Sequence, residues 1–129
     1  MLSCSLMSNL GKLGEDIVAE EYQKQGYRIV ARNYIFPKGK QMGELDLVCS
    51  KKRELVFVEV KLRQSEHYGT SFEAVDDYKQ AKLVRMAKLF IQIHPKFQDH
   101  NYRIDVAAVA IDKGISSVTI LTNAIEDLD

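Results

Sequence analysis

Carboxylates and a lysine interrupt two stretches of the chain that are otherwise aliphatic. Glu44 and Asp46 lie in the first stretch, and Glu59 and Lys61 lie in the second. A charged side chain in a core strand is costly unless it is paired or binds something. Clustered carboxylates offer hard oxygen ligands, which suit Mg²⁺ or Mn²⁺ rather than zinc. A lysine beside them can neutralise a phosphate oxygen or orient a water, so these residues are suited to hydrolysing a phosphodiester.

Strand geometry decides whether the two sets of charges meet. Side chains alternate between faces, which puts Glu44 and Asp46 on one face and Leu45 and Leu47 on the other. A turn of two or four residues between the strands would bring Asp46 and Glu59 to the same side, roughly 5 to 8 Å apart at Cβ. A three-residue turn would send them to opposite faces. Spacing alone leaves open an ion-pair network that binds no substrate.

Hydrophobic periodicity predicts elements in the order α-β-β-β-α-β-β. The predicted elements are a helix from Ser8 or Asn9 to Gln25, strands Tyr27–Phe36, Gly43–Cys49 and Leu55–Leu62, a helix from Phe72 or Asp76 to His94, and strands Tyr102–Ile111 and Ile115–Thr122. The short link between the second and third strands predicts an antiparallel hairpin. We therefore expect an α/β fold with a mixed five-stranded sheet flanked by helices. Residues 1–7 are expected to form a loose tail, and residues 8–129 a single domain.

Composition limits the classes of function. The chain has 129 residues with 18 basic and 18 acidic side chains, so a nucleic-acid partner must be recognised by local patches rather than by net charge. Two cysteines are too few for a disulfide framework or a zinc cluster. No run approaches the roughly 20 apolar residues that span a bilayer, so we expect a cytoplasmic protein without a membrane partner.

The second predicted helix carries a basic strip. Its basic residues recur at three-residue spacing: Lys79, Lys82, Arg85 and Lys88. Such a strip suits a DNA backbone, although it is also typical of the solvated face of an amphipathic helix. Glu15 lies at the edge of the apolar arc of the first helix, and Asp105 is expected to pair with a base such as Arg103 or Lys61.

Several motifs in order resemble a known family. Gly43-Glu44-Leu45-Asp46 and Glu59-Val60-Lys61 resemble the active-site signature of the PD-(D/E)xK nuclease superfamily. The wider pattern resembles the YraN-like uncharacterised bacterial proteins: Gly11-x-x-Gly14-Glu15, Ala31-Arg32-Asn33-Tyr34, Gly43 to Val48, Val56 to Lys61, Tyr68-Gly69, Glu73-Ala74-Val75, Lys79-Gln80 and Arg103-Ile104-Asp105-Val106. Leu45 stands where the superfamily has its nominal proline, and the loop before Gly43 is longer than the family leads us to expect.

The resemblance implies a restriction-endonuclease-like core similar to that of Holliday junction resolvases. It implies that Asp46 and Glu59 bind Mg²⁺ or Mn²⁺, that Lys61 is the catalytic lysine, and that Glu15 adds a carboxylate from the first helix. It also implies that Gln80 lies near the active site. The similarity to resolvases is compatible with a homodimer but leaves the oligomeric state open.

Three hypotheses follow from the residues and the resemblance. The first is a metal-dependent endonuclease that cuts DNA, including branched or junction DNA. The second is a nucleic-acid-binding module with an inactive nuclease-like site, and the third is a protein-interaction scaffold. For the first two, the predicted nucleic-acid-binding residues are Lys79, Gln80, Lys82 and Arg85.

Overall fold

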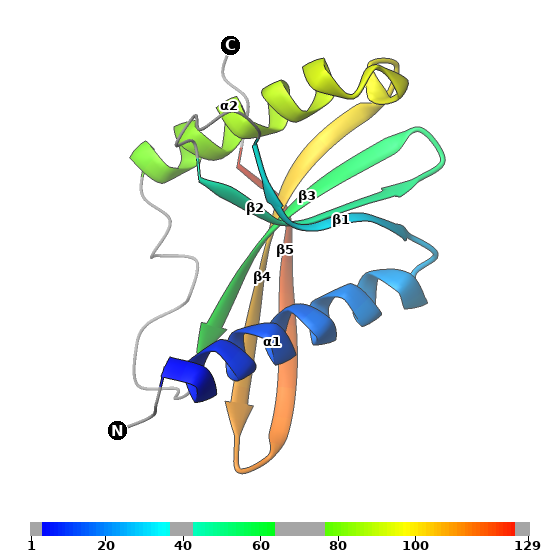
Figure 1. The fold of residues 1–129 in the computed structure, drawn as a ribbon. Coiled ribbons are helices and arrows are strands. Elements are labelled where there is room, and N and C mark those ends of the chain that lie inside the picture. Colours follow the sequence, from blue (N-terminus) through cyan, green and yellow to red (C-terminus); the bar gives the residue numbers. More distant parts are fainter. Residues whose placement is uncertain (1–3, 37–42, 64–76, 126–129) are drawn as a thin grey trace.

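A computed structural model describes residues 4–36, 43–63 and 77–125, with side chains described for residues 11–36, 43–62 and 77–125. The described part is a mixed five-stranded sheet with two long helices (Figure 1). Its elements are α1 (Cys4–Lys24), β1 (Arg28–Ile35), β2 (Glu44–Lys51), β3 (Glu54–Arg63), α2 (Asp77–Ile93), η2 (Pro95–Phe97), β4 (Asn101–Asp112) and β5 (Ile115–Ile125). The predicted order of helices and strands is confirmed.

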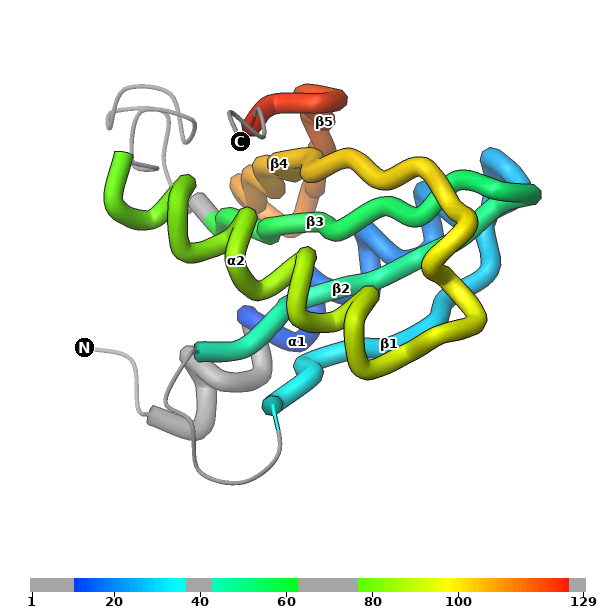
Figure 2. Tube along the Cα trace, turned by 90° about the horizontal axis from the view of Figure 1, so that it is seen from above, coloured from blue at the N-terminus to red at the C-terminus, as the bar shows by residue number. Residues whose placement is uncertain are grey.

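The strands lie side by side in chain order, β1-β2-β3-β4-β5. β3 and β4 are parallel, and the other neighbouring pairs are antiparallel. Parallel strands need a long crossover, which here contains α2. Figure 2 shows α2 crossing over β2 and β3, and Figure 1 shows α1 on the opposite face of the sheet.

Each face of the sheet carries its own apolar layer. On the α2 face, the Phe90 ring lies 5.6 Å from the ring of Phe57 and 5.0 Å from that of Tyr34 between centroids. On the α1 face, Val18 and Tyr22 of the helix pack against strand residues such as Leu47. The two layers fix both helices against the sheet, so side chains from either helix can be held beside the strands.

Element ends differ from the prediction at a few positions. The first helix begins at Cys4 rather than at Ser8 or Asn9, so it includes part of the expected tail. Its end agrees with the sequence, because Gly26 has a φ of 94°, the left-handed conformation that glycine adopts after a helix. β5 continues to Ile125, beyond the predicted end at Thr122. The expected N-cap of the second helix, Asp76, lies outside the described residues.

The turn between β2 and β3 has an even number of residues. Lys51 pairs with Glu54, which leaves a two-residue turn. The register continues to Leu47 opposite Val58. The last pair is followed on each strand by Asp46 and Glu59, so the even turn gives the parity that the catalytic hypothesis requires.

The predicted alternation of side chains fails at Asp46. Leu45 packs in the α2-side layer whereas Leu47 packs in the α1-side layer, so the two leucines do not share a face. In β1, the residue at the same level is Asn33, which has a φ of 51°. A residue in the left-handed region breaks the regular pleat of a strand, and the neighbouring strand follows it. Asp46 therefore lies where β2 changes face.

Candidate functional site

Three carboxylates from two elements converge at the start of β2. One carboxylate oxygen from each of Glu15, Glu44 and Asp46 lies within 4.8 Å of the others, and we call these residues the carboxylate cluster. The convergence of Glu15 on Asp46 agrees with the sequence-based expectation. Glu44 was not among the predicted catalytic residues. The signal that could have found it is its place two residues before Asp46 on the same strand.

Asp46 lies in the fork between β2 and β3. The backbone N–H of Val60 donates a hydrogen bond of 2.9 Å to Asp46 Oδ2. The carboxylate thus takes the place beside β3 that a neighbouring strand's carbonyl takes in a regular ladder. This bond fixes the side chain within the sheet, between the α1 and α2 faces.

The environment of Asp46 disfavours its negative charge. Burial raises the pKa of Asp46, and the charges of Glu59, Glu15 and Glu44 raise it further, to about 7. The hydrogen bond from Val60 acts in the opposite direction. A cation held by these carboxylates would remove both the repulsion and the cost of burial.

Glu15 is held in place by residues of β1. Asn33 Nδ2 donates a hydrogen bond of 3.0 Å to Glu15 Oε1, and Arg32 Nη2 lies 3.9 Å from the same oxygen. Arg32 also forms a closer ion pair, 2.6 Å, with Asp16. Asn33, whose backbone is left-handed, thus donates its side-chain amide to a carboxylate of the cluster.

Glu59 lies next to the carboxylate cluster and between two lysines. Its Oε1 is 3.7 Å from Lys61 Nζ and 3.6 Å from Lys79 Nζ. The predicted catalytic residues Glu59 and Lys61 are therefore adjacent to each other and close enough to Asp46 to affect its charge. Glu59 is not one of the three residues of the 4.8 Å group, so its pairing with Asp46 as a metal ligand stays a prediction.

The two lysines influence each other's protonation. Burial lowers the pKa of Lys61, and its contact with Lys79 lowers it further, against the attraction of Glu59 and Asp46. The contact with Lys61 and the charge of Glu59 raise the pKa of Lys79.

A pocket of about 430 Å³ opens between the hairpin and α2. Its lining residues are Gly43, Glu44, Glu59, Tyr78, Lys79, Lys82, Leu83 and Met86. Glu44 belongs to both the pocket and the carboxylate cluster. Lys82 lies against Gly43, where an added Cβ would be 3.2 Å from Lys82 Nζ and where φ is 99°. A glycine at this position thus leaves room for the lysine at the entrance to the strand.

Of the four predicted nucleic-acid-binding residues, two line this pocket. Lys79 and Lys82 contribute to its α2 wall. Arg85 is exposed on the same helix, and Gln80 is half-buried, and neither is among the lining residues. The structure thus places two of these four residues in the pocket that Glu44 and Glu59 also line.

The donor set fits a hard divalent cation. Every atom of the carboxylate cluster that can bind a metal is an oxygen, and magnesium is typically held by one or two carboxylates with water and substrate oxygens completing its shell. The adjoining pocket leaves space for such substrate oxygens. Mg²⁺ and Mn²⁺ therefore suit these residues better than a metal that prefers nitrogen or sulfur.

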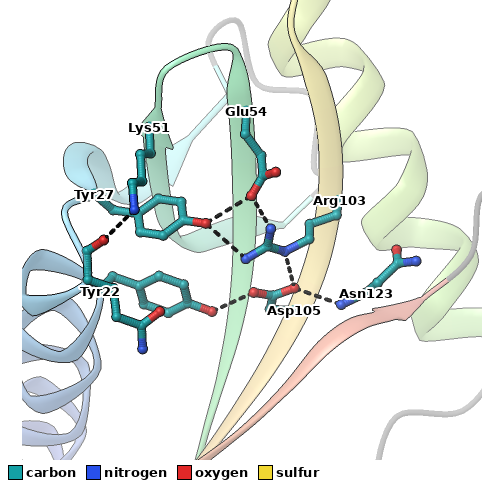
Figure 3. Close-up of polar contacts among 8 residues, drawn as sticks. Tyr22, Tyr27, Lys51, Glu54, Arg103, Asp105 and Asn123 are labelled. Atoms are coloured by element: carbon teal, nitrogen blue, oxygen red, sulfur yellow. Dashed lines mark hydrogen bonds and ion pairs between the residues drawn. The ribbon is translucent and has the colours of Figure 1, made fainter.

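A second charged group is centred on Asp105 of β4, whose side chain is fully buried. Asp105 accepts hydrogen bonds from the Tyr22 hydroxyl at 2.7 Å, from Arg103 Nε at 3.0 Å and from the Asn123 backbone at 2.8 Å (Figure 3). Of the two partners expected for Asp105, the structure shows Arg103. Arg103 also forms an ion pair with Glu54, so its guanidinium lies between two carboxylates. These ion pairs offset the cost of burying the charge of Asp105.

Comparison with protein-family models identifies a match over most of the chain. Residues 14–109 match the uncharacterised protein family UPF0102. The chain belongs to this family. The match includes the whole carboxylate cluster, Glu59 and Lys61.

Curated UPF0102 proteins from diverse bacteria are similar to the chain. The protein from Syntrophomonas wolfei is 37% identical over 115 residues, which cover 89% of this chain and 96% of the relative. The protein from Alkaliphilus metalliredigens is 38% identical, covering 84% and 90%, and that from Renibacterium salmoninarum is 42% identical, covering 81% and 85%. The relatives are described only by the family name, so a function must be argued from the site.

None of the helices in residues 4–36 and 77–125 combines the length and the apolar character needed to cross a bilayer.

Proposed function

We propose that this UPF0102 protein is a metal-dependent nuclease of the PD-(D/E)xK type that hydrolyses DNA phosphodiesters. The observation that carries the proposal is the convergence of Glu15, Glu44 and Asp46 beside Glu59 and Lys61. This group adjoins a pocket whose opposite wall carries lysines of α2. Carboxylates for a metal and cations for a phosphate are thus present within one site.

The residues have distinct proposed roles. Asp46 would hold Mg²⁺ or Mn²⁺ with Glu59, as the signature implies. Glu15, which the resemblance also implies, and Glu44, which the geometry adds, would support them. When bound, the metal would polarise the phosphate and lower the pKa of an attacking water. Lys61, held by Glu59 at 3.7 Å, would orient that water or neutralise a phosphate oxygen.

The α2 wall of the pocket is proposed to bind the substrate backbone. Lys79 and Lys82 line the pocket, and Arg85 extends the same basic helix beyond it. Positive side chains along one helix neutralise phosphates without reading base sequence. This arrangement fits a nuclease that selects DNA by shape, and branched or junction DNA is the proposed substrate.

Cleavage of defined DNAs tests the proposal. Linear, flapped and four-way junction DNAs would be incubated with the protein in Mg²⁺ or Mn²⁺ and resolved on denaturing gels. We expect metal-dependent cuts that disappear in EDTA and in Asp46→Asn and Lys61→Ala variants. Glu20→Gln, which changes an exposed acid on α1, is the matched control and should cut like the wild type. Failure to cut any DNA, or full activity of Asp46→Asn, would reject the nuclease.

A DNA-binding module with an inactive site is the second candidate, and the presence of Lys82 in the pocket favours it as well. It shares salt-dependent DNA binding with the nuclease but lacks metal-dependent turnover. In Lys82→Glu/Arg85→Glu, we expect the slope of log K against log salt to fall by about 2 in magnitude if both residues contact phosphates. Lys113→Glu, in the β4–β5 turn, is the control.

Calorimetric titration separates these two candidates and the interaction scaffold. Heat of Mn²⁺ binding that is lost in Asp46→Asn supports a nuclease site, whereas salt-sensitive DNA binding without metal heat supports the module. A scaffold that contacts only proteins would show neither signal.

A further inference from the structure

One edge strand of the sheet, β5, carries neither charge nor proline, and its pairing is regular over most of its length. β5 is the last strand and pairs with β4 alone among the described strands. Its sequence, Ile115 to Ile125, contains no charged residue and no proline. An outer strand presents unpaired backbone groups that can pair with another chain, and proteins usually blunt it with charge, proline or a bulge.

The opposite edge of the same sheet is protected by such features. β1 carries Arg28 and Arg32, and its register shifts between Ile29 and Ala31. Asn33 adds a left-handed residue to the same strand. β5 also has a register shift and a left-handed residue, Asn123, but both lie beyond Leu121. The contrast between the two edges is therefore one of charge, and of the regular pairing of β5 from Ile115 to Leu121.

The regular part of β5 also presents apolar side chains to solvent. Ile115 is 74% exposed and Leu121 is 45% exposed, and alternation places both on the same face. The register with β4 is continuous from Ile115 to Leu121. It becomes irregular only beyond Leu121, where Asn123 has a φ of 50°. The segment from Ile115 to Leu121 is therefore regularly paired, uncharged and partly apolar.

We propose that a second copy of this chain pairs with β5 through its own β5, antiparallel about a twofold axis near Val118. This register places Ile115 opposite the partner's Leu121 and Ser117 opposite the partner's Thr119. The exposed aliphatic side chains then cover one another, and no like charges meet because the strand has none. Main-chain hydrogen bonds join the two sheets into one, as in other strand-addition complexes. The dimer is independent of whether the protein is a nuclease.

Light scattering after size-exclusion chromatography tests the dimer. The wild-type chain should elute as a dimer that dissociates on dilution. Ser117→Lys/Thr119→Lys places lysines directly opposite each other across the twofold axis, which is destabilising, and should weaken dimerisation by about tenfold or more. Ile35→Lys, at an equally exposed position on the other edge strand, is the control and should remain dimeric.

Charge reversal tests the register itself. Ser117→Glu/Thr119→Glu alone should also be monomeric, whereas mixing it with the double-lysine variant should restore a mixed dimer. Circular dichroism and thermal melts would show that each variant is folded. A monomeric wild type at all concentrations, a double-lysine variant that dimerises normally, or oppositely charged variants that do not pair would each overturn the proposal.

Discussion

Asp46 is a carboxylate whose own surroundings oppose its charge, and this has a consequence for stability. Its pKa is about 7 in the folded chain and near 3.8 in the unfolded chain, so between these values the folded state binds more protons. The free energy of unfolding therefore falls as pH rises through this window. In EDTA, we expect the wild type to lose on the order of 1 to 3 kcal/mol from Asp46 between about pH 4 and pH 7. Asp46→Asn should not show this loss. Urea unfolding at a series of pH values measures it.

Glu20→Gln is the control for this pH dependence. Glu20 lies on α1 with its side chain 69% exposed, so its removal should leave the pH profile of the wild type unchanged. If the stability of the wild type and of Asp46→Asn changed in parallel with pH, the fold would not disfavour the charged form of Asp46.

The buried Asp105 depends on donors from distant parts of the chain. Tyr22→Phe removes the 2.7 Å hydrogen bond from α1 and leaves a fully buried carboxylate with fewer donors. We expect the free energy of unfolding to fall by about 1 to 3 kcal/mol, the cost of losing a donor to a buried charged group. Urea unfolding near pH 7 measures the change.

Tyr34→Phe provides a comparison with the same chemical change. Tyr34 also packs in a core layer, where the structure shows ring contacts with Phe36, Phe90 and His94. Tyr34→Phe should lower the free energy of unfolding clearly less than Tyr22→Phe does. Equal losses in the two variants would mean that the bond to Asp105 contributes little.

The residues of the site could be predicted from the sequence only in part. Asp46, Glu59 and Lys61 stand out because charge is unexpected in buried strands. Glu15 could be placed only through resemblance, since a glutamate at the edge of a helix's apolar arc is ordinary. The hydrogen bond from Tyr22 to Asp105 spans 83 positions, a separation at which local patterns carry no information.

At the scale of elements, strand identity and order were predictable and the path of β2 was not. Alternation predicted that Leu45 and Leu47 share a face, and the structure places them in opposite layers. The break lies beside a left-handed residue in the neighbouring strand, a conformation that the residue type of Asn33 permits but does not require. The turn length was also left open, because Lys52-Arg53 carries none of the usual signals of a two-residue hairpin turn.

Substitution by alanine should change the free energy of unfolding in opposite directions at Gly11, within α1, and at Gly26, just after its end. At Gly11, an added Cβ meets nothing within 4 Å, so Gly11→Ala should raise the free energy of unfolding by about 0.5 to 1 kcal/mol. At Gly26, φ is 94° and an added Cβ would lie 3.3 Å from Lys51, so Gly26→Ala should lower it by about 1 kcal/mol. Thermal and urea unfolding compare the two variants. Stabilisation by both substitutions would contradict the left-handed end of α1.

At the scale of the whole molecule, the carboxylate cluster connects parts that otherwise pack in separate layers. Glu15 comes from α1, Glu44 and Asp46 from β2, and Lys79 approaches Glu59 from α2 on the other face. A cation bound to the cluster would bind the folded chain and not the unfolded one. Metal binding should therefore stabilise the entire fold.

The size of this stabilisation follows from mass action. At a free Mn²⁺ concentration of about 100 times the dissociation constant, the free energy of unfolding should rise by about 2.7 kcal/mol. At one fixed Mn²⁺ concentration, the gain should be larger at pH 8 than at pH 5. Protons compete with the metal for Asp46, whose pKa is about 7, and so weaken metal binding at the lower pH. Asp46→Asn should lose most of the gain, and Glu20→Gln should keep it. Thermal melts with and without Mn²⁺ at the two pH values measure the effect. An equal shift in Asp46→Asn and the wild type would place the bound metal away from the carboxylate cluster.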